Sequence, residues 1–187
     1  MSWVLIGILV VVVLLVIYVI ALYNGLVQKR NRVDNSWAQI EVQLKRRRDL
    51  IPNLVETVKG YATHERETFE KVTEARADAM KAQGPVQAAK AEGRLNAVLG
   101  DLRAVAENYP TLRATENFQQ LSRNLSEIED EIQASRRIYN SNVQAYNTKI
   151  QVFPNSVIAN SGGFTAREFF EIEDASEREA PEVSFSS

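Results

Sequence analysis

The sequence predicts an all-α protein in which an N-terminal transmembrane helix continues into an antiparallel bundle of long helices, with an extended C-terminal tail. Three observations lead to this fold class. An uncharged apolar run opens the chain, apolar residues recur at helical spacing over most of the remaining residues, and no run shows the period-two alternation of a strand. The expected organisation is a transmembrane anchor over 1–28, a helical bundle over 29–153 and a tail over 154–187.

The predicted anchor is the segment between Trp3 and Tyr23, which is almost purely aliphatic; residues 1–28 carry no charged side chain. About 20 apolar residues at a rise of about 1.5 Å span the hydrocarbon core of a bilayer, which is roughly 30 Å thick. A cleaved signal peptide is the alternative. Such peptides have a basic start and an apolar core of about 7–15 residues, whereas this run is longer and nothing basic precedes it. We therefore expect a permanent anchor and a lipid bilayer as partner.

The flanks of the anchor predict its orientation. Lys29, Arg30 and Arg32 follow the apolar run, and the positive-inside rule then places the bundle in the cytoplasm and the N-terminus outside. Aromatic rings favour the membrane interface. The predicted membrane-interface residues are therefore Trp3, Tyr23, Lys29, Arg30 and Arg32.

Composition excludes several classes of function. The formal net charge of −2 does not support a general nucleic-acid-binding surface. The chain has no cysteine, which excludes disulfides, thiolate catalysis and cysteine-ligated metals. About 160 residues after the anchor suffice for one domain with a real core.

The first helix is expected to continue from the membrane into the bundle, because no Gly or Pro cluster separates the two and a single glycine, Gly25, is tolerated. Its apolar residues alternate at spacings of four and three, with Arg47 filling one position, as in a heptad seam. The seam consists of Val33, Trp37, Ile40, Leu44, Ile51, Leu54, Val58 and Tyr61. Gly60 and the residues after it offer a stop.

Two shorter helices are expected next. The first covers about 65–83, with Phe69, Val72, Ala79 and Met80 facing inward, and ends at Gly84-Pro85. The second covers about 86–108. Its apolar stripe consists of Leu95, Val98, Leu99, Leu102 and Val105.

The last predicted helix is long, about 111–152, and Pro154 stops it. Its stripe keeps the three/four spacing through Phe118, Leu121, Leu125, Ile128, Ile132, Tyr139, Val143, Tyr146, Ile150 and Phe153. We interpret both long stripes as bundle core rather than a cofactor site, and we predict no cofactor.

The tail after Pro154 changes character. Gly162 and Gly163 form a predicted turn, and acidic residues dominate from 167 to 182. One interpretation is a disordered acidic end. The other is that Phe164, Phe169 and Phe170 dock on the bundle or on a neighbouring subunit, because a loose tail seldom needs three aromatic residues.

The sequence does not contain the common catalytic motifs. The single histidine, His64, precedes Glu65, but the second histidine of a zinc-protease motif would be at 68, where Thr68 stands. Phosphate-binding, dinucleotide-binding and nucleophile-elbow motifs do not occur in the sequence. We therefore predict neither a catalytic residue nor a metal site, and a protein that is not an enzyme.

A basic run in the first helix predicts ion pairs between helices. The run consists of Lys45-Arg46-Arg47-Arg48. It begins about 33 Å beyond Tyr23, which is several Debye lengths from the membrane surface, so a flat membrane would not attract it. If the last helix returns antiparallel, acidic side chains near Ile132 come within reach. The predicted interhelical ion pairs involve Arg46, Arg47 and Arg48 with Glu127, Asp130 and Glu131. Arg47 lies on the seam and should be among the more buried.

Several blocks of the sequence closely resemble the LemA family. The most specific is Arg47-Arg48-Asp49-Leu50-Ile51-Pro52-Asn53-Leu54, in which Arg48 stands where relatives often carry His. Others are Trp37-Ala38-Gln39-Ile40-Glu41, Arg136-Arg137-Ile138-Tyr139-Asn140, Phe153-Pro154-Asn155 and Pro181-Glu182-Val183-Ser184-Phe185. The resemblance covers essentially the whole chain. It implies a bacterial single-span protein with an extracellular N-terminus and a helical bundle, and it implies no reaction.

The resemblance also leans toward membrane organisation, since some relatives are associated with formation of the magnetosome membrane. The leading hypothesis is a non-enzymatic scaffold in the bacterial inner membrane that forms homo-oligomers and organises or remodels the membrane. The alternative is a monomeric adaptor that recruits a protease or a signalling protein of unknown identity. Neither hypothesis involves nucleic acid.

Overall fold

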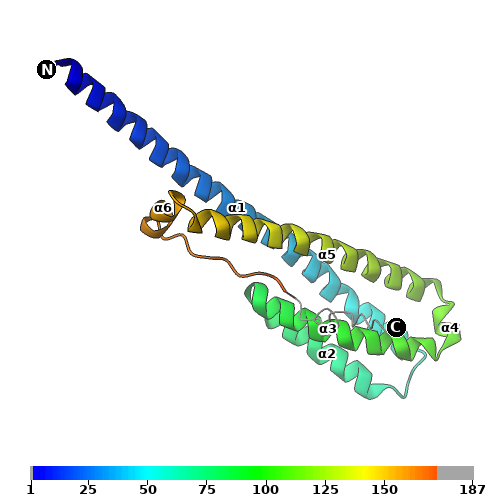
Figure 1. The fold of residues 1–187 in the computed structure, drawn as a ribbon. Helices are drawn as coiled ribbons and strands as arrows, with labels where there is room; N and C mark the ends of the chain where they lie inside the picture. The colour runs from blue at the N-terminus through cyan, green and yellow to red at the C-terminus, as the bar shows by residue number, and fades with distance from the viewer. Residues whose placement is uncertain (1, 172–187) are drawn as a thin grey trace, which may run out of the picture. The chain divides into compact units, whose positions relative to one another are not determined.

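The computed structural model describes residues 2–171, and these residues form six helices and no strand (Figure 1). The helices are α1 (Ser2–Lys59), α2 (Arg66–Lys81), α3 (Gly84–Glu107), α4 (Pro110–Arg113), α5 (Glu116–Gln151) and α6 (Asn155–Ser161). The predicted all-α class is confirmed, and so is the continuity of the apolar N-terminal helix with the helical region after it. The part of the predicted tail from residue 172 onward lies outside the described residues.

The long last helix that we predicted is divided. A short α4 ends at Arg113, and α5 begins at Glu116. Thr115 lies between them, and its Oγ1 accepts a hydrogen bond from the Phe118 amide at 3.4 Å while its hydroxyl donates to the Leu112 carbonyl at 2.7 Å. Threonine in this position satisfies a free amide of the next helix, which favours a new start there.

The tail that we predicted to be extended from residue 154 begins instead with α6. This helix ends at a glycine pair. Gly163 has a φ of +68°, a conformation that glycine adopts at little cost. The Phe164 amide donates to the Ala159 carbonyl at 2.9 Å, which closes the helix end.

Contacts divide the chain into two compact units. Of the described residues, the first unit contains 2–40 and 135–169, and the second contains 41–134 and 170–171. Helices α1 and α5 contribute to both.

The core of the first unit lies between α1 and α5. The two helices run antiparallel to each other here. The ring centroids of Trp37 on α1 and Tyr139 on α5 lie 5.4 Å apart. Burying side chains of this size stabilises the fold by roughly 1.5–3 kcal/mol each. The core consists of Leu26, Val33, Ile40, Tyr139, Val143, Tyr146, Ile150, Ala159 and Phe164.

The second unit has a continuous core drawn from the end of α1, from α2 to α4, and from the start of α5. Its largest fully buried members are Ile51, Leu95, Leu102, Leu112 and Val58. Alanines line the packed faces of α2 and α3, where small side chains permit close approach. They include Ala75, Ala79, Ala88 and Ala89.

Three residues that we predicted to face the core are exposed: Tyr61, Met80 and Phe153. Each lies at or beyond a helix end. Tyr61 follows the end of α1 at Lys59, Met80 is in the last turn of α2, and Phe153 follows the end of α5 at Gln151. Apolar spacing carried past the end of a helix does not predict burial, which explains Tyr61 and Phe153. Met80 is still within α2, but it stands one residue beyond the buried face that Val72, Ala75 and Ala79 form.

Candidate functional site

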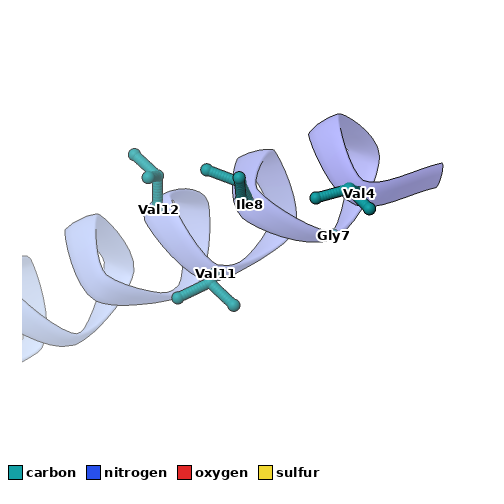
Figure 2. A pocket seen from close by; sticks show the side chains of 5 residues that line it. All are labelled: Val4, Gly7, Ile8, Val11 and Val12. Atoms are coloured by element: carbon teal, nitrogen blue, oxygen red, sulfur yellow. The ribbon is translucent and has the colours of Figure 1, made fainter. Parts of the chain in front are cut away.

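The N-terminal part of α1 is apolar and uncovered. Every residue from 2 to 21 is exposed, and within the described chain this helix is the one long and apolar enough to cross a membrane. Figure 2 shows Val4, Ile8, Val11 and Val12 projecting from the helix, with Gly7 leaving a shallow notch between turns. A continuous apolar surface of this size does not persist against water, which indicates a non-aqueous partner for this segment.

Packing of α1 begins where the apolar run ends. Leu22 is half-buried and Leu26 is fully buried. Of the predicted interface residues, Trp3 is 85% exposed at the free end, and Tyr23 remains exposed at the packed end. Lys29 and Arg30 are half-buried, and Arg32 is exposed.

Phe164, which follows α6, packs against α1 at the base of the apolar segment. Its ring meets Tyr23 edge-on at 5.5 Å between centroids, and the Arg30 guanidinium lies 5.2 Å above it. Edge-to-face aromatic pairs and cations over aromatic rings are each worth about 0.5–1.5 kcal/mol beyond simple burial. Of the three residues predicted to dock, Phe164 is thus buried against its own chain, Phe169 is half-buried, and Phe170 is fully buried in the second unit.

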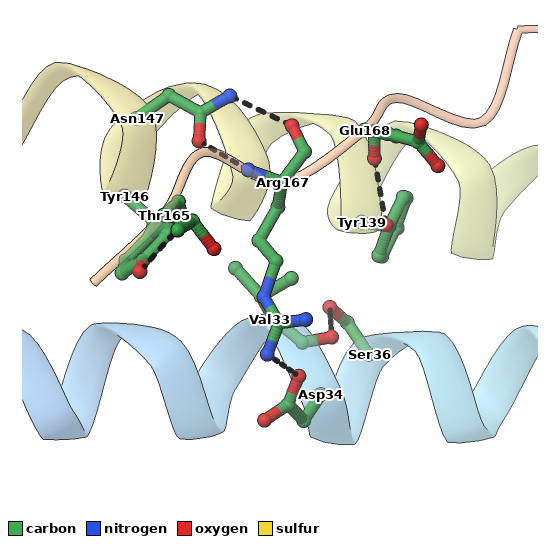
Figure 3. Close-up of polar contacts among 9 residues, drawn as sticks. All are labelled: Val33, Asp34, Ser36, Tyr139, Tyr146, Asn147, Thr165, Arg167 and Glu168. Carbon is green, nitrogen blue, oxygen red and sulfur yellow. Dashed lines mark hydrogen bonds and ion pairs between the residues drawn. The ribbon is translucent and has the colours of Figure 1, made fainter. Parts of the chain in front are cut away.

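Residues 164–169, which we name the strap, lie along α5 in extended form (Figure 3). The Asn147 side chain pairs with the Arg167 backbone twice. Its Nδ2 donates to the Arg167 carbonyl at 2.9 Å, and its Oδ1 accepts from the Arg167 amide at 2.8 Å. A side-chain amide here replaces the hydrogen-bond partners that a neighbouring strand would provide.

Two tyrosines of α5 bind the strap on either side of Arg167. The Tyr146 hydroxyl donates to the Thr165 carbonyl at 3.0 Å, and the Tyr139 hydroxyl donates to the Glu168 carbonyl at 2.8 Å. Burial raises the pKa of Tyr139 to about 12, and it also raises the pKa of Tyr146. Both phenols therefore keep their protons, and both remain donors, throughout the physiological range.

Arg167 also connects the strap to α1. Its guanidinium lies 3.0 Å from the Asp34 carboxylate, and both side chains are well exposed. Exposed ion pairs contribute at most about 1 kcal/mol. The pair therefore adds little to the stability of the strap (Figure 3).

Gly162 has no room for a side chain. A Cβ there would lie 2.8 Å from Cε2 of Phe164 and 3.0 Å from the Ile158 carbonyl oxygen. We predict that Gly162→Ala lowers the free energy of unfolding by about 1–3 kcal/mol, the usual cost of overpacking. Urea titration in mild detergent, followed by circular dichroism, measures this.

Gly25→Ala is the matched control for that substitution, because a Cβ at Gly25 meets nothing within 4 Å. Alanine in a helix interior is favoured over glycine by about 0.5–1 kcal/mol, so this variant should be slightly more stable. Equal effects of the two substitutions would contradict the close packing of Phe164 on Gly162.

The second unit contains a buried charged cluster. Arg47 is 4% exposed, and its guanidinium lies 3.0 Å from Glu92 of α3 and 3.0 Å from Glu129 of α5. Glu92 is itself 1% exposed. The guanidinium thus joins three helices through two carboxylates, an arrangement that suits its planar set of donors.

The other predicted pairs are placed as follows. Arg46 lies 3.1 Å from Glu131, and both are exposed. Arg48 donates to the Ala79 carbonyl of α2 at 2.7 Å rather than to a carboxylate. Within residues 2–171, no ion pair involves Glu127 or Asp130, and both of these residues are exposed.

Glu92 and Glu129 were missed by the sequence reasoning. For Glu92 a signal existed. It precedes Leu95 by three residues and so extends the apolar stripe of α3 by one position, where a charge requires a partner. Arg47 occupies the equivalent charged position on the seam of α1.

Burial raises the pKa of Glu92, and the nearby Arg47 guanidinium offsets this only in part. The folded state therefore binds this proton more tightly than the unfolded state. The contribution of Glu92 to stability is largest below its ordinary pKa of 4.5 and falls as the pH rises through the folded-state value.

We predict that Glu92→Gln removes this part of the pH dependence. The free energy of unfolding of the wild type, measured upward from pH 4.5, should fall more steeply than that of the variant. Glu131→Gln, at the exposed pair, should follow the wild type. A Glu92→Gln curve parallel to the wild-type curve would show that Glu92 does not titrate abnormally.

Among residues 2–171, no group of three or more His, Cys, Asp or Glu side chains is placed to hold a metal ion. A shallow groove of about 720 Å³ lies on the second unit between the end of α1 and α2. It is lined in part by Lys59, Thr63, Arg66, Phe69, Glu70 and Thr73.

Comparison with known proteins identifies a matching family and several relatives of the chain. The profile of the LemA family matches residues 36–185. "Protein LemA" of Metamycoplasma hominis is 30% identical over 140 residues, which is 73% of this chain and 63% of that protein. "Magnetosome protein MamQ 2" of Paramagnetospirillum magneticum is 27% identical over 175 residues, 80% of this chain and 64% of that protein.

"Magnetosome protein MamQ" of Magnetospirillum gryphiswaldense is 25% identical over 174 residues, 79% of this chain and 64% of that protein. The chain therefore spans somewhat less than two thirds of the length of these relatives. None of the three names describes a reaction.

Proposed function

This chain belongs to the LemA family, and from that premise we propose that it is a non-enzymatic membrane scaffold. In this proposal α1 crosses the bilayer through its uncovered segment, the packed units lie in the cytoplasm, and copies of the chain associate to organise or remodel the membrane. The observation that carries the proposal is the uncovered apolar part of α1, which passes without a break into packed helix.

The length of the uncovered segment supports a span. Residues 2–21 are exposed throughout, and about 20 residues of helix match the roughly 30 Å hydrocarbon core. Coverage begins at Leu22, so the folded part of the chain starts where the bilayer would end. The basic residues Lys29, Arg30 and Arg32 then favour a cytoplasmic position for the folded units.

We predict the orientation of the span from these charges and test it with cysteine labelling, since the chain has no cysteine of its own. In bacterial spheroplasts, a membrane-impermeant maleimide should label Ser2→Cys directly and label Asn31→Cys only after lysis. Labelling of both in detergent is the control. The opposite pattern would reverse the proposed topology.

Two relatives are named magnetosome proteins, which favours a task in membrane organisation, and in our proposal copies of this chain associate to carry out that task. The test is the protein mass of the full-length chain in mild detergent, measured by light scattering. We expect a large and uniform oligomer, and site-directed crosslinks between copies in native membranes. A monomer under both conditions would overturn the scaffold.

The second candidate is a monomeric adaptor that recruits a protease or a signalling protein. The groove between the end of α1 and α2 favours it, because that groove combines the ring of Phe69 with charged borders. Crosslinking from Thr73→Cys distinguishes the two candidates. A single heterologous partner without contacts between copies supports the adaptor.

A further inference from the structure

The corner between α5 and α6 has an unusual composition. Residues 150–166 carry no charged side chain, and Lys149 and Arg167 stand directly outside the two ends of this stretch. Apart from the N-terminal apolar run, this is the longest stretch of the sequence without a charged side chain. We name residues 150–163 the corner.

The corner lies beside α1 at the base of the uncovered segment. Phe164, which follows the corner directly, contacts both Tyr23 and Arg30. These residues all belong to the first unit, and Figure 1 shows α6 next to the part of α1 from which the free segment departs. The corner is therefore level with the end of the apolar run.

The corner presents apolar side chains that contact little else in the chain. Phe153 is 82% exposed, Val157 is 58% exposed, and Val152 is 45% exposed. Val152 and Phe153 lie between α5 and α6, and Val157 is on the exposed face of α6. Exposed aromatic and aliphatic side chains, grouped without a charge among them, indicate an apolar partner.

The position of this patch identifies the partner as the bilayer. A helix that crosses the membrane up to Tyr23 brings everything packed at Tyr23 to the interface between hydrocarbon and headgroups. Basic residues follow on the side of the corner away from the span: Lys29 and Arg30 come after Tyr23 on α1, and Lys149 directly precedes the corner on α5. Cations suit the headgroup phosphates at that depth.

We propose that the corner is a second membrane-contact element, in which Phe153 and Val157 rest in the interfacial layer of the leaflet from which α1 emerges. This inference rests on the proposed membrane span. Two points of contact, the span and the corner, would define the rotation of the first unit about the axis of α1, which a single helix leaves free.

Single-cysteine variants of the full-length chain test the proposal, with an environment-sensitive fluorophore (NBD) at each site. The protein is reconstituted in vesicles of phosphatidylcholine and phosphatidylglycerol. Phe153→Cys and Val157→Cys probe the corner, and Val13→Cys probes the span. Ile138→Cys is the matched control, because Ile138 is also an exposed apolar residue of the first unit, at 53%, but lies on α5 about 22 Å before Phe153.

Quenching by nitroxide-labelled lipid is the readout. We expect strong quenching at Val13 by a deep nitroxide, quenching at Phe153 and Val157 by a shallow nitroxide, and none at Ile138. If the corner labels are quenched by aqueous iodide as strongly as Ile138, while Val13 remains in lipid, the corner proposal is wrong and the span stands.

A label at Val13 that is open to iodide would instead overturn the span. Corner labels with blue-shifted emission but no quenching from either side would also overturn the lipid contact, since another copy of the chain would then cover the corner. Because the two corner residues are exposed, their substitution should not disturb folding, and circular dichroism of each variant checks this.

Discussion

Replacing Arg47 by methionine is expected to lower the free energy of unfolding of the second unit by about 3–5 kcal/mol, the usual cost of removing one partner from a buried ion pair. Methionine fills a similar volume but leaves Glu92 buried without a cation. Glu129 loses the same partner but is less affected, because its side chain is 30% exposed. Hydrogen exchange of the α3 amides around Glu92 measures the loss locally, and urea titration measures it globally.

Arg46→Met is the matched control. Arg46 precedes Arg47 on the same helix and pairs with Glu131, but more than half of each side chain is exposed. Water already screens this pair, so the expected loss is at most about 1 kcal/mol. Similar losses in the two variants would show that burial of Arg47 does not govern its contribution.

The double variant Arg47→Met/Glu92→Leu separates the value of the pair from the cost of leaving one charge alone. Replacing both charges by apolar side chains often restores stability. We therefore expect the double variant to be more stable than Arg47→Met. A double variant as unstable as the single one would assign the loss to packing of the guanidinium instead.

The sequence predicted the helices and their buried faces well because apolar spacing reports directly on one side of a helix. The positions Val33, Ile40, Leu44, Ile51 and Val58 of the predicted seam are all buried. Helix ends were harder to place. They depend on single hydrogen bonds, such as the one that Thr115 accepts from the Phe118 amide, which compete closely with continuation of the helix.

The charged cluster could be predicted only in part. The seam position of Arg47 indicated burial, but its partner Glu92 lies on α3, and the register of α3 against α1 is not contained in the spacing of either helix. An antiparallel return of the last helix brought Glu131 near Arg46. A partner on a third helix requires knowledge of how that helix packs.

The strap was suggested by its phenylalanines but not by its hydrogen bonds. Asn147, Tyr139 and Tyr146 all bind backbone atoms of the strap. Every residue except proline carries the same backbone N–H donor and carbonyl acceptor. Such hydrogen bonds therefore do not depend on which side chains the strap carries, and its sequence cannot predict them. The useful signal lies on α5, where tyrosines in an apolar stripe require partners for their hydroxyls once they are buried.

Replacing Phe164 by alanine is expected to have the second large effect, a loss of about 3–5 kcal/mol in the stability of the first unit, as for other buried phenylalanines. Phe164 is 6% exposed and provides the ring that Tyr23 and Arg30 contact. Its loss should also loosen the strap, so that trypsin cleaves after Arg167 more rapidly than in the wild type. Fluorescence of Trp37, which packs on Tyr139 in the same unit, reports unfolding.

Phe153→Ala is the matched control, because the same side chain is removed in the same unit from a position that is 82% exposed. In mild detergent its effect on unfolding should stay below about 1 kcal/mol, and cleavage after Arg167 should remain slow. If Phe164→Ala is destabilised but the strap stays protected, the hydrogen bonds from Asn147 and the two tyrosines suffice to hold it. If cleavage accelerates in step with the loss of stability, the ring of Phe164 is what fastens the strap to the base of the anchor.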